Sequence, residues 1–490
     1  MEDNSARSLP AVLSMFKCNR FRAQFKHFGF AQTIFTLAIF ISVFCFALLR
    51  CRIAFTTGQY GVKSPMPFLQ ARQILGGLDA GSYLQGALSL HDSSFRESIN
   101  QFIWQLWPPG LPIYEAILIY IFGLGGKPLL LLAVTDSLLI AVSASVLWIE
   151  SVNLRRKKIA IFFLSILLLS SVVQGWLLDQ GIMYAEGFFV FLLILAVIHL
   201  IRFERTKKFF SFYLSSFLLG LAAYFRAVGF TTIEVIILVA FLIGGFGFAL
   251  KIWKSPSAGK IVHLAANLLR YGFVAFAVTL PWSLFRLSWT KLNPLQWVIT
   301  GDLTWKLVWR SDISLQKTGL GITKGVDNWA CHLDLMRCKT LSLEMTPHYF
   351  AESLRVIVQH PIEFLWMRLT AFWGYWSLNG RWLYPPQNRL PVAFAYLEGA
   401  VFLVITIAAL ILVLTSWRRF PSLSILTLCI FFGTTAPLLV FHLESRYFIP
   451  VKILAIVIVT LHPNTTLGIR KMRMFLTARH TSSRKTIKSD

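Results

Sequence analysis

The chain has 490 residues, of which 56% are hydrophobic and 14% are charged, and its mean hydropathy is +0.64. Soluble domains carry about a quarter charged residues, so this composition excludes an ordinary soluble enzyme. The excess of 47 Lys and Arg over 22 Asp and Glu gives a formal net charge of +25. In a soluble protein this charge would point to nucleic acid, but the hydropathy favours a membrane protein whose basic residues set its topology. We therefore expect membrane lipid, and no nucleic acid, as a partner.

Long apolar runs follow one another along most of the chain. The clearest are 31–49, 159–175, 184–201, 211–229, 231–250, 270–289, 393–416, 421–441 and 447–462. Two further regions, 111–149 and 361–378, are harder to divide. A span needs about 20 apolar residues, so the sequence predicts an all-α, polytopic transmembrane bundle of about 10–13 spans. We expect a cytoplasmic segment at 1–30, a transmembrane module at 31–462 and a basic cytoplasmic tail at 463–490.

Basic residues gather in the connections that face the cytoplasm, and they set the expected orientation. The clusters lie at 20–26, 155–158, 207–208, 251–260, 418–419 and in the tail. With these inside, the connections 51–110, 176–183, 290–360 and 442–446 lie outside. The two larger loops, 51–110 and 290–360, are expected to carry short amphipathic helices. The scheme requires an odd number of crossings in 111–149 and none in 361–378.

Two cysteines, Cys331 and Cys338, share the predicted outer loop 290–360. They are compatible with a disulfide in an oxidising compartment and equally with two unpaired thiols. A zinc site there is not expected, because His332 is the one further nitrogen ligand nearby and a structural site needs four ligands.

Several acidic residues lie at the predicted outer ends of spans, where a charge is costly and is a functional candidate. Asp79 lies in the first large loop and could accept a proton or hold a cation, or it could cap the loop. Glu115 lies one turn into the run that opens with Pro108 and Pro109, whose role is structural. Asp179 lies in the connection 176–183 and Glu186 at the start of the run 184–201, where Glu186 could equally be a first-turn partner of the helix dipole.

Basic residues also occur at predicted outer ends. Arg226 follows a run of small residues, where its guanidinium could bind phosphate or extend to the membrane interface. His442, Glu444 and Arg446 lie in a short hairpin between two late spans, where Arg446 could bind an anionic headgroup or pair with Glu444. Two further acids, Asp136 and Glu234, lie within spans and have no assignable partner.

In order and spacing, these residues resemble the GT-C superfamily of membrane glycosyltransferases, in the branch of aminoarabinose transferase and the protein O-mannosyltransferases. The resemblance covers about residues 30–460 and rests on Asp79 with Tyr83, on Pro108-Pro109, on Asp179 or Glu186, on the run from Gly220 to Gly229 with Arg226, and on Glu444-Ser445-Arg446-Tyr447 followed by Pro450. Many family members have two adjacent acids in the first loop, where this chain has Asp79 and Ala80.

The resemblance implies an inverting glycosyltransferase that uses a polyprenyl-phosphate sugar at the outer face of a bacterial plasma membrane, in cell-envelope biogenesis. It implies Asp79 as the catalytic acid-base residue and Arg226 and Arg446 as ligands of the lipid phosphate. Substrate contacts are expected from Tyr83, Asp179, Glu186, His442 and Glu444. The acceptor would be a lipid, a glycan or a protein. Because Ala80 replaces the second acid, no obligatory metal or other cofactor is expected. A transporter or flippase of lipid-linked sugars is the alternative function, although paired halves with interrupted helices are not evident.

Overall fold

The computed structural model describes residues 30–51, 79–92, 108–170, 184–253, 257–290, 392–441 and 448–463, together with positions 358, 361, 362, 365, 369, 372, 376 and 465. These residues form helices and no strand. The helices are α3 (Phe30–Arg50), α6 (Asp79–Asp92), α9 (Gly110–Phe122), α10 (Lys127–Asn153), α11 (Lys157–Leu169), α13 (Glu186–Thr206), α14 (Phe209–Ala223), α15 (Val228–Ile252), α16 (Ala258–Thr290), α23 (Val392–Ser416), α24 (Pro421–Phe441) and α25 (Ile449–Leu461).

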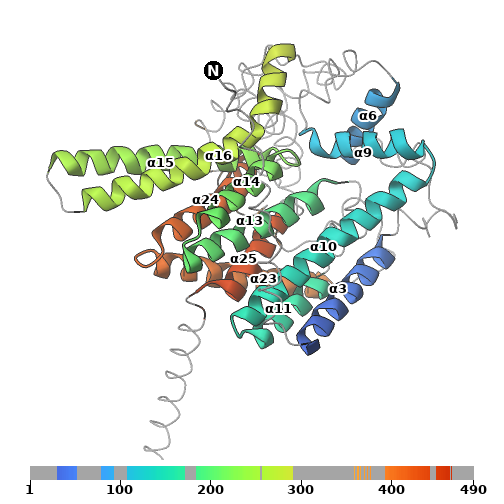
Figure 1. Cartoon of the computed structure of the whole chain (residues 1–490), viewed down its shortest axis with the longest axis horizontal. Helices are drawn as coiled ribbons and strands as arrows, with labels where there is room; N and C mark the ends of the chain where they lie inside the picture. The colour runs from blue at the N-terminus through green and yellow to red at the C-terminus, as the bar shows by residue number, and fades with distance from the viewer. Residues whose placement is uncertain are drawn as a thin grey trace, which may run out of the picture.

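Within the described ranges, six helices are long and apolar enough to cross a membrane, and four shorter helices are also apolar. The six are α3, α10, α13, α15, α16 and α23. In Figure 1, α15 and α16 project together from one side of the bundle, and α15 exposes large apolar side chains such as Phe241, Phe246 and Phe248. Exposed apolar faces of this kind suit contact with lipid. The predicted all-α, multi-pass architecture is confirmed.

The region 111–149 divides into a short helix and a long one. Gly123, at a φ of 74°, ends α9 in a backbone conformation that favours glycine, and Pro128 lies in the first turn of α10. At 1.5 Å per residue, the 13 residues of α9 span about 20 Å and the 27 residues of α10 about 40 Å. Of these two helices, α10 is long enough to cross the hydrocarbon core by itself and α9 is not.

Helices α3 and α10 pack side by side in opposite directions (Figure 1). The rings of Phe35 and Trp148 lie 4.9 Å apart, whereas Cys51 Sγ lies 3.8 Å from Ser137 Oγ. The start of α3 and the end of α10 therefore lie at the same end of the bundle. This placement agrees with an odd number of crossings in 111–149.

Three helix connections and the end of α25 meet at that end, which we call the basic end. Arg202 of α13 donates to the Glu150 carboxylate of α10, with Nε 3.0 Å from Oε1. Arg156, between α10 and α11, donates to the carbonyl oxygens of Thr460 and His462 at 2.9 and 2.8 Å. His462 in turn lies 3.0 Å from the hydroxyl of Ser416, the last residue of α23. The basic clusters at 155–158, 207–208 and 418–419 thus share one end.

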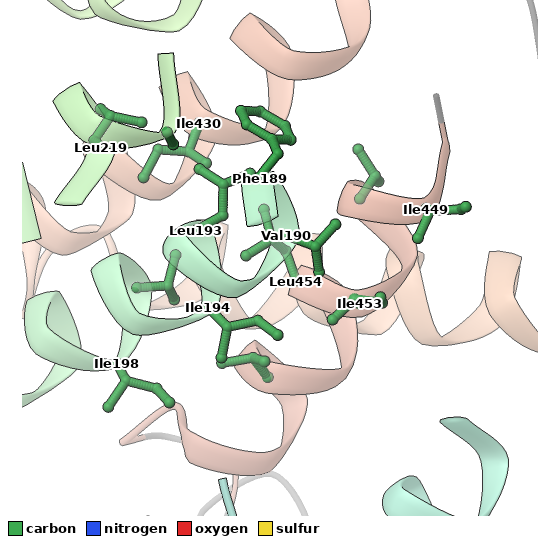
Figure 2. Packing of buried hydrophobic residues seen from close by; sticks show 14 of the residues in the cluster. Phe189, Val190, Leu193, Ile194, Ile198, Leu219, Ile430, Ile449, Ile453 and Leu454 are labelled. Atoms are coloured by element: carbon green, nitrogen blue, oxygen red, sulfur yellow. The ribbon is translucent and has the colours of Figure 1, made fainter. Parts of the chain in front are cut away.

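Helix α13 lies at the centre of the core. Its residues Phe189, Val190, Leu193, Ile194 and Ile198 are buried, and α14, α24 and α25 pack around them. Figure 2 shows these side chains beside Leu219 of α14, Ile430 of α24 and Ile449, Ile453 and Leu454 of α25. This packing fixes the direction of α13 and hence the position of its first residue.

Candidate functional site

A buried ion pair lies at the end of the bundle opposite the basic end. Glu186 is the first residue of α13, and its carboxylate accepts a hydrogen bond from Arg226 Nη1 in the turn between α14 and α15. The side chains of Glu186 and Arg226 are only 1% and 7% exposed. We call this end of the bundle the site end. Arg226 therefore does not extend to the interface, and Glu186 is both a first-turn residue and an ion-pair partner.

The turn that carries Arg226 is built by close packing of small residues. The amide of Arg226 donates to Ala222 O at 3.2 Å, and its carbonyl accepts from the amide of Gly229 at 2.9 Å. A Cβ at Gly229 would lie 2.6 Å from Ala223 Cα, and one at Gly220 would lie 2.5 Å from Ala275 O of α16. The small-residue run therefore allows helices to approach closely, and Arg226 is the cation that the turn presents.

The start of α9 is attached to the same turn. The amide of Gly110 donates to Tyr224 O at 2.7 Å, and a Cβ at position 110 would lie 2.6 Å from that oxygen. Tyr224 is itself held by α16, because its hydroxyl donates to Val278 O at 2.9 Å. Helix α6 packs along α9 (Figure 1). Glycine after the two prolines is therefore required for close approach to the turn that bears Arg226.

Aromatic rings join α9, α13 and this turn. Phe225, next to Arg226, stacks on Phe188 of α13 with ring centroids 4.7 Å apart, and Phe188 meets Tyr114 of α9 edge-on at 5.4 Å. The Tyr114 hydroxyl lies 2.6 Å from Thr135 Oγ1 on α10. These contacts hold four chain segments around the ion pair and restrict its side chains.

Asp136 of α10 lies beside the first turn of α13. A Cβ at Gly187 would lie 1.9 Å from Asp136 Oδ1, so the carboxylate occupies the space above that glycine. Asp136 interacts electrostatically with Glu186, and its Oδ2 is enclosed without a hydrogen-bond partner among the described residues. Two carboxylates, those of Asp136 and Glu186, therefore lie close together at the start of α13, and Arg226 pairs with Glu186.

A third acid, Glu115 of α9, is fully buried, and neither of its carboxylate oxygens has a hydrogen-bond partner in the part of the chain that the structure describes. Across the described ranges, His, Cys, Asp and Glu side chains do not gather in groups of three that could hold a metal ion. The chemistry that the site can offer from these residues is charge stabilisation by Arg226 and proton exchange with enclosed carboxylates.

The remaining predicted site residues are distributed as follows. Asp79 is the first residue of α6, and Tyr83 is a buried residue of the same helix. Asp179, His442, Glu444 and Arg446 lie outside the described residues. The structure thus brings Glu186 and Arg226 together and connects the helix of Asp79 to them through α9.

Three functional candidates were not assigned a role from the sequence. Gly110 and Asp136 reach their partners only in the tertiary structure. Lys452, on α25, is buried at the site end, and the signal that could have indicated it is a lysine inside an otherwise apolar helix.

The fold and the buried polar groups define a multi-pass helical membrane protein with an enclosed, charged site at one end. No family model and no curated protein matches the chain. Among solved structures, the chain is similar to the crystal structure of ArnT from Cupriavidus metallidurans bound to undecaprenyl phosphate. The two are 14% identical, the match covers 88% of this chain and 78% of that one, and the TM-score is 0.31.

Proposed function

We propose that this protein is a membrane glycosyltransferase that moves a sugar from a polyprenyl-phosphate donor to a lipid, glycan or protein acceptor. The observation that carries the proposal is the enclosed Arg226, held by Glu186 at the site end. A guanidinium binds phosphate oxygens with directed hydrogen bonds, and burial strengthens this interaction. By the distribution of basic residues, the site end faces the outside of a bacterial plasma membrane.

In the proposed reaction, an acceptor oxygen attacks the anomeric carbon of the sugar from the side opposite the phosphate. The bond between that carbon and the phosphate oxygen breaks, and its electron pair remains on the leaving phosphate. Arg226, with Arg446, stabilises this charge, while Asp79 accepts the proton of the acceptor. Tyr83, Asp179, Glu186, His442 and Glu444 are proposed to bind the substrates.

The placement of α6 supports the role proposed for Asp79. Helix α6 begins at Asp79 and packs on α9, and α9 is attached through Gly110 to the turn that carries Arg226. A base and a phosphate-binding cation carried by connected elements can act on the two ends of one glycosyl transfer.

The test is the transfer of a radiolabelled sugar from a polyprenyl-phosphate donor by the purified protein in lipid nanodiscs. We expect Asp79→Asn and Arg226→Met each to reduce turnover by about 100-fold or more. Arg270→Met is the matched control, because Arg270 is an exposed arginine of α16. If the wild-type protein in vesicles moves the intact labelled lipid across the bilayer and releases no sugar, the proposal is wrong and a flippase takes its place.

A further inference from the structure

Lys452 is enclosed by protein although it carries an ammonium group. It is the fourth residue of α25 and is 1% exposed. A lysine inside a membrane-spanning helix is costly unless its charge is compensated, so its contacts indicate what it does.

The ammonium group of Lys452 contacts elements that are distant in the sequence. Nζ donates to the carbonyl oxygen of Trp376 at 2.7 Å. It also lies 4.9 Å from the centroid of the Trp376 ring and 5.3 Å from that of Phe402 on α23. These are cation–π distances, and such contacts are strongest in a desolvated site.

A second layer of contacts extends this network. Trp376 Nε1 donates to Gly399 O of α23 at 2.8 Å. The neighbouring Glu398 interacts electrostatically with Lys452 and accepts a hydrogen bond of 2.5 Å from Ser170, which follows α11. Lys452 therefore joins α25 to α23 and to Trp376, and through Glu398 to the end of α11.

Aromatic packing continues from this network to the start of α25. The ring of Phe448, the residue before α25, lies 5.3 Å from the rings of both Phe372 and Trp376. On its other side α25 packs against α13, and Figure 2 shows Ile453 and Leu454 beside Val190. A shift at the start of α25 would thus reach the helix that carries Glu186.

We propose that Lys452 is a positioning residue that fixes the start of α25 and, through the packing of α25 on α13, the place of Glu186 and its partner Arg226. The inference rests on the proposed function for the role of Arg226. The contacts of Phe448 and Lys452 hold the first turn of α25 against Trp376 and α23, and the same helix packs on α13, whose first residue is Glu186. Methionine at position 452 would fill a similar volume but could neither donate to Trp376 nor form cation–π contacts with the two aromatic rings.

The first measurement follows the start of α25 without reference to activity. Ile449 is buried, so a cysteine at this position, in a chain whose six native cysteines are replaced, should react slowly with a maleimide in nanodiscs. We expect Lys452→Met to speed this labelling by about tenfold or more, because local opening becomes easier when the cation–π contacts are lost. The exposed Lys127, at the start of α10, supplies the control Lys127→Met, which should leave the rate unchanged.

The second measurement is steady-state transfer from the polyprenyl-phosphate sugar. We expect Lys452→Met to raise KM for the donor by about tenfold with a much smaller change in kcat, and Lys452→Arg, which keeps the charge, to recover part of the loss. Unchanged labelling in Lys452→Met overturns the proposal whatever the activity. Faster labelling with an unchanged KM overturns the link to donor binding. If the wild-type protein transfers no sugar, the proposed function fails, and the labelling rate still decides whether Lys452 fixes α25.

Discussion

The guanidinium of Arg226 donates to the carboxylate of Glu186, which lies 40 positions earlier in the chain, and protein encloses both groups. Asp136 lies beside the first turn of α13 and interacts electrostatically with Glu186. Loss of the arginine would therefore leave two neighbouring carboxylates without the cation that pairs with Glu186, whereas loss of the charge of Glu186 would also remove its repulsion with Asp136.

This arrangement predicts unequal effects of two substitutions. Breaking a buried pair from one side costs about 3–5 kcal/mol. We expect Arg226→Met to lower the free energy of unfolding by an amount in this range, seen as a lower apparent Tm in detergent, and Glu186→Gln to lower Tm less, because it also removes the repulsion between Glu186 and Asp136. Arg270→Met, at an exposed position of α16, should leave Tm unchanged. Equal losses for the two variants, or a larger loss for Glu186→Gln, would show that repulsion between Glu186 and Asp136 does not affect stability.

A second prediction concerns Gly110, whose amide donates to Tyr224 O at 2.7 Å. In Gly110→Ala the new Cβ would lie 2.6 Å from that oxygen and 3.0 Å from the ring of Phe225. The chain must move to relieve this overlap, at a cost of about 1–3 kcal/mol. Because the turn also carries Arg226, we expect a lower Tm together with weaker sugar transfer.

Gly125→Ala is the matched control, since a Cβ at Gly125 meets no atom within 4 Å and its φ is not positive. Thermal unfolding followed by intrinsic fluorescence, together with the transfer assay, compares the two variants. If Gly110→Ala behaves as Gly125→Ala does, the contact with Tyr224 does not hold the turn.

Much of this fold could be predicted because a bilayer imposes a simple length rule on the chain. The apolar run 184–201 corresponds to α13 at Glu186–Thr206, and the run 421–441 to α24 at Pro421–Phe441. The ends are also local, because Pro128 and Gly123 determine where α10 begins and α9 ends. The basic clusters then predicted which connections share one end of the bundle.

The sequence indicated individual residues of the site but not which of them lie together. Glu186 and Arg226 were separate candidates, and each had a local explanation, namely the helix dipole or extension to the interface. Their pairing depends on how α13 and the turn after α14 pack, which periodicity does not reveal. The same holds for Gly110, because its partner Tyr224 lies in another helix connection.

A third prediction tests the contact between Asp136 and Gly187. A methyl group in Gly187→Ala would lie 1.9 Å from Asp136 Oδ1, which forces either the carboxylate or the start of α13 to move. We expect a loss of about 1–3 kcal/mol in stability. Adding Asp136→Ala removes the obstructing carboxylate, so the double variant should regain stability relative to Gly187→Ala. Thermal unfolding of the two single variants and the double variant measures this coupling. Additive losses would mean that the two positions are not in contact.

The last prediction concerns pH and the basic end, outside the membrane-spanning helices. Burial, reinforced by the nearby charge of Arg156, lowers the pKa of His462 from 6.5 to about 4. The unfolded chain therefore binds a proton between pH 6.5 and 4 that the folded protein does not bind. Stability due to neutral His462 is thus complete above pH 6.5 and falls as the pH drops through this window, by at most about 1.4 kcal/mol per pH unit.

Carboxyl groups also titrate in part of this range, so the informative quantity is the difference between the wild-type protein and His462→Gln. Glutamine has no titrating proton and can still form a hydrogen bond with Ser416, which lies 3.0 Å from His462 Nε2. We expect Tm of the wild-type protein to fall more steeply than that of His462→Gln from pH 6.5 to 4, and the two curves to run parallel above pH 7. Parallel curves over the whole range would show that His462 takes up a proton as readily in the folded protein as in the unfolded chain, in conflict with its enclosed position beside Arg156.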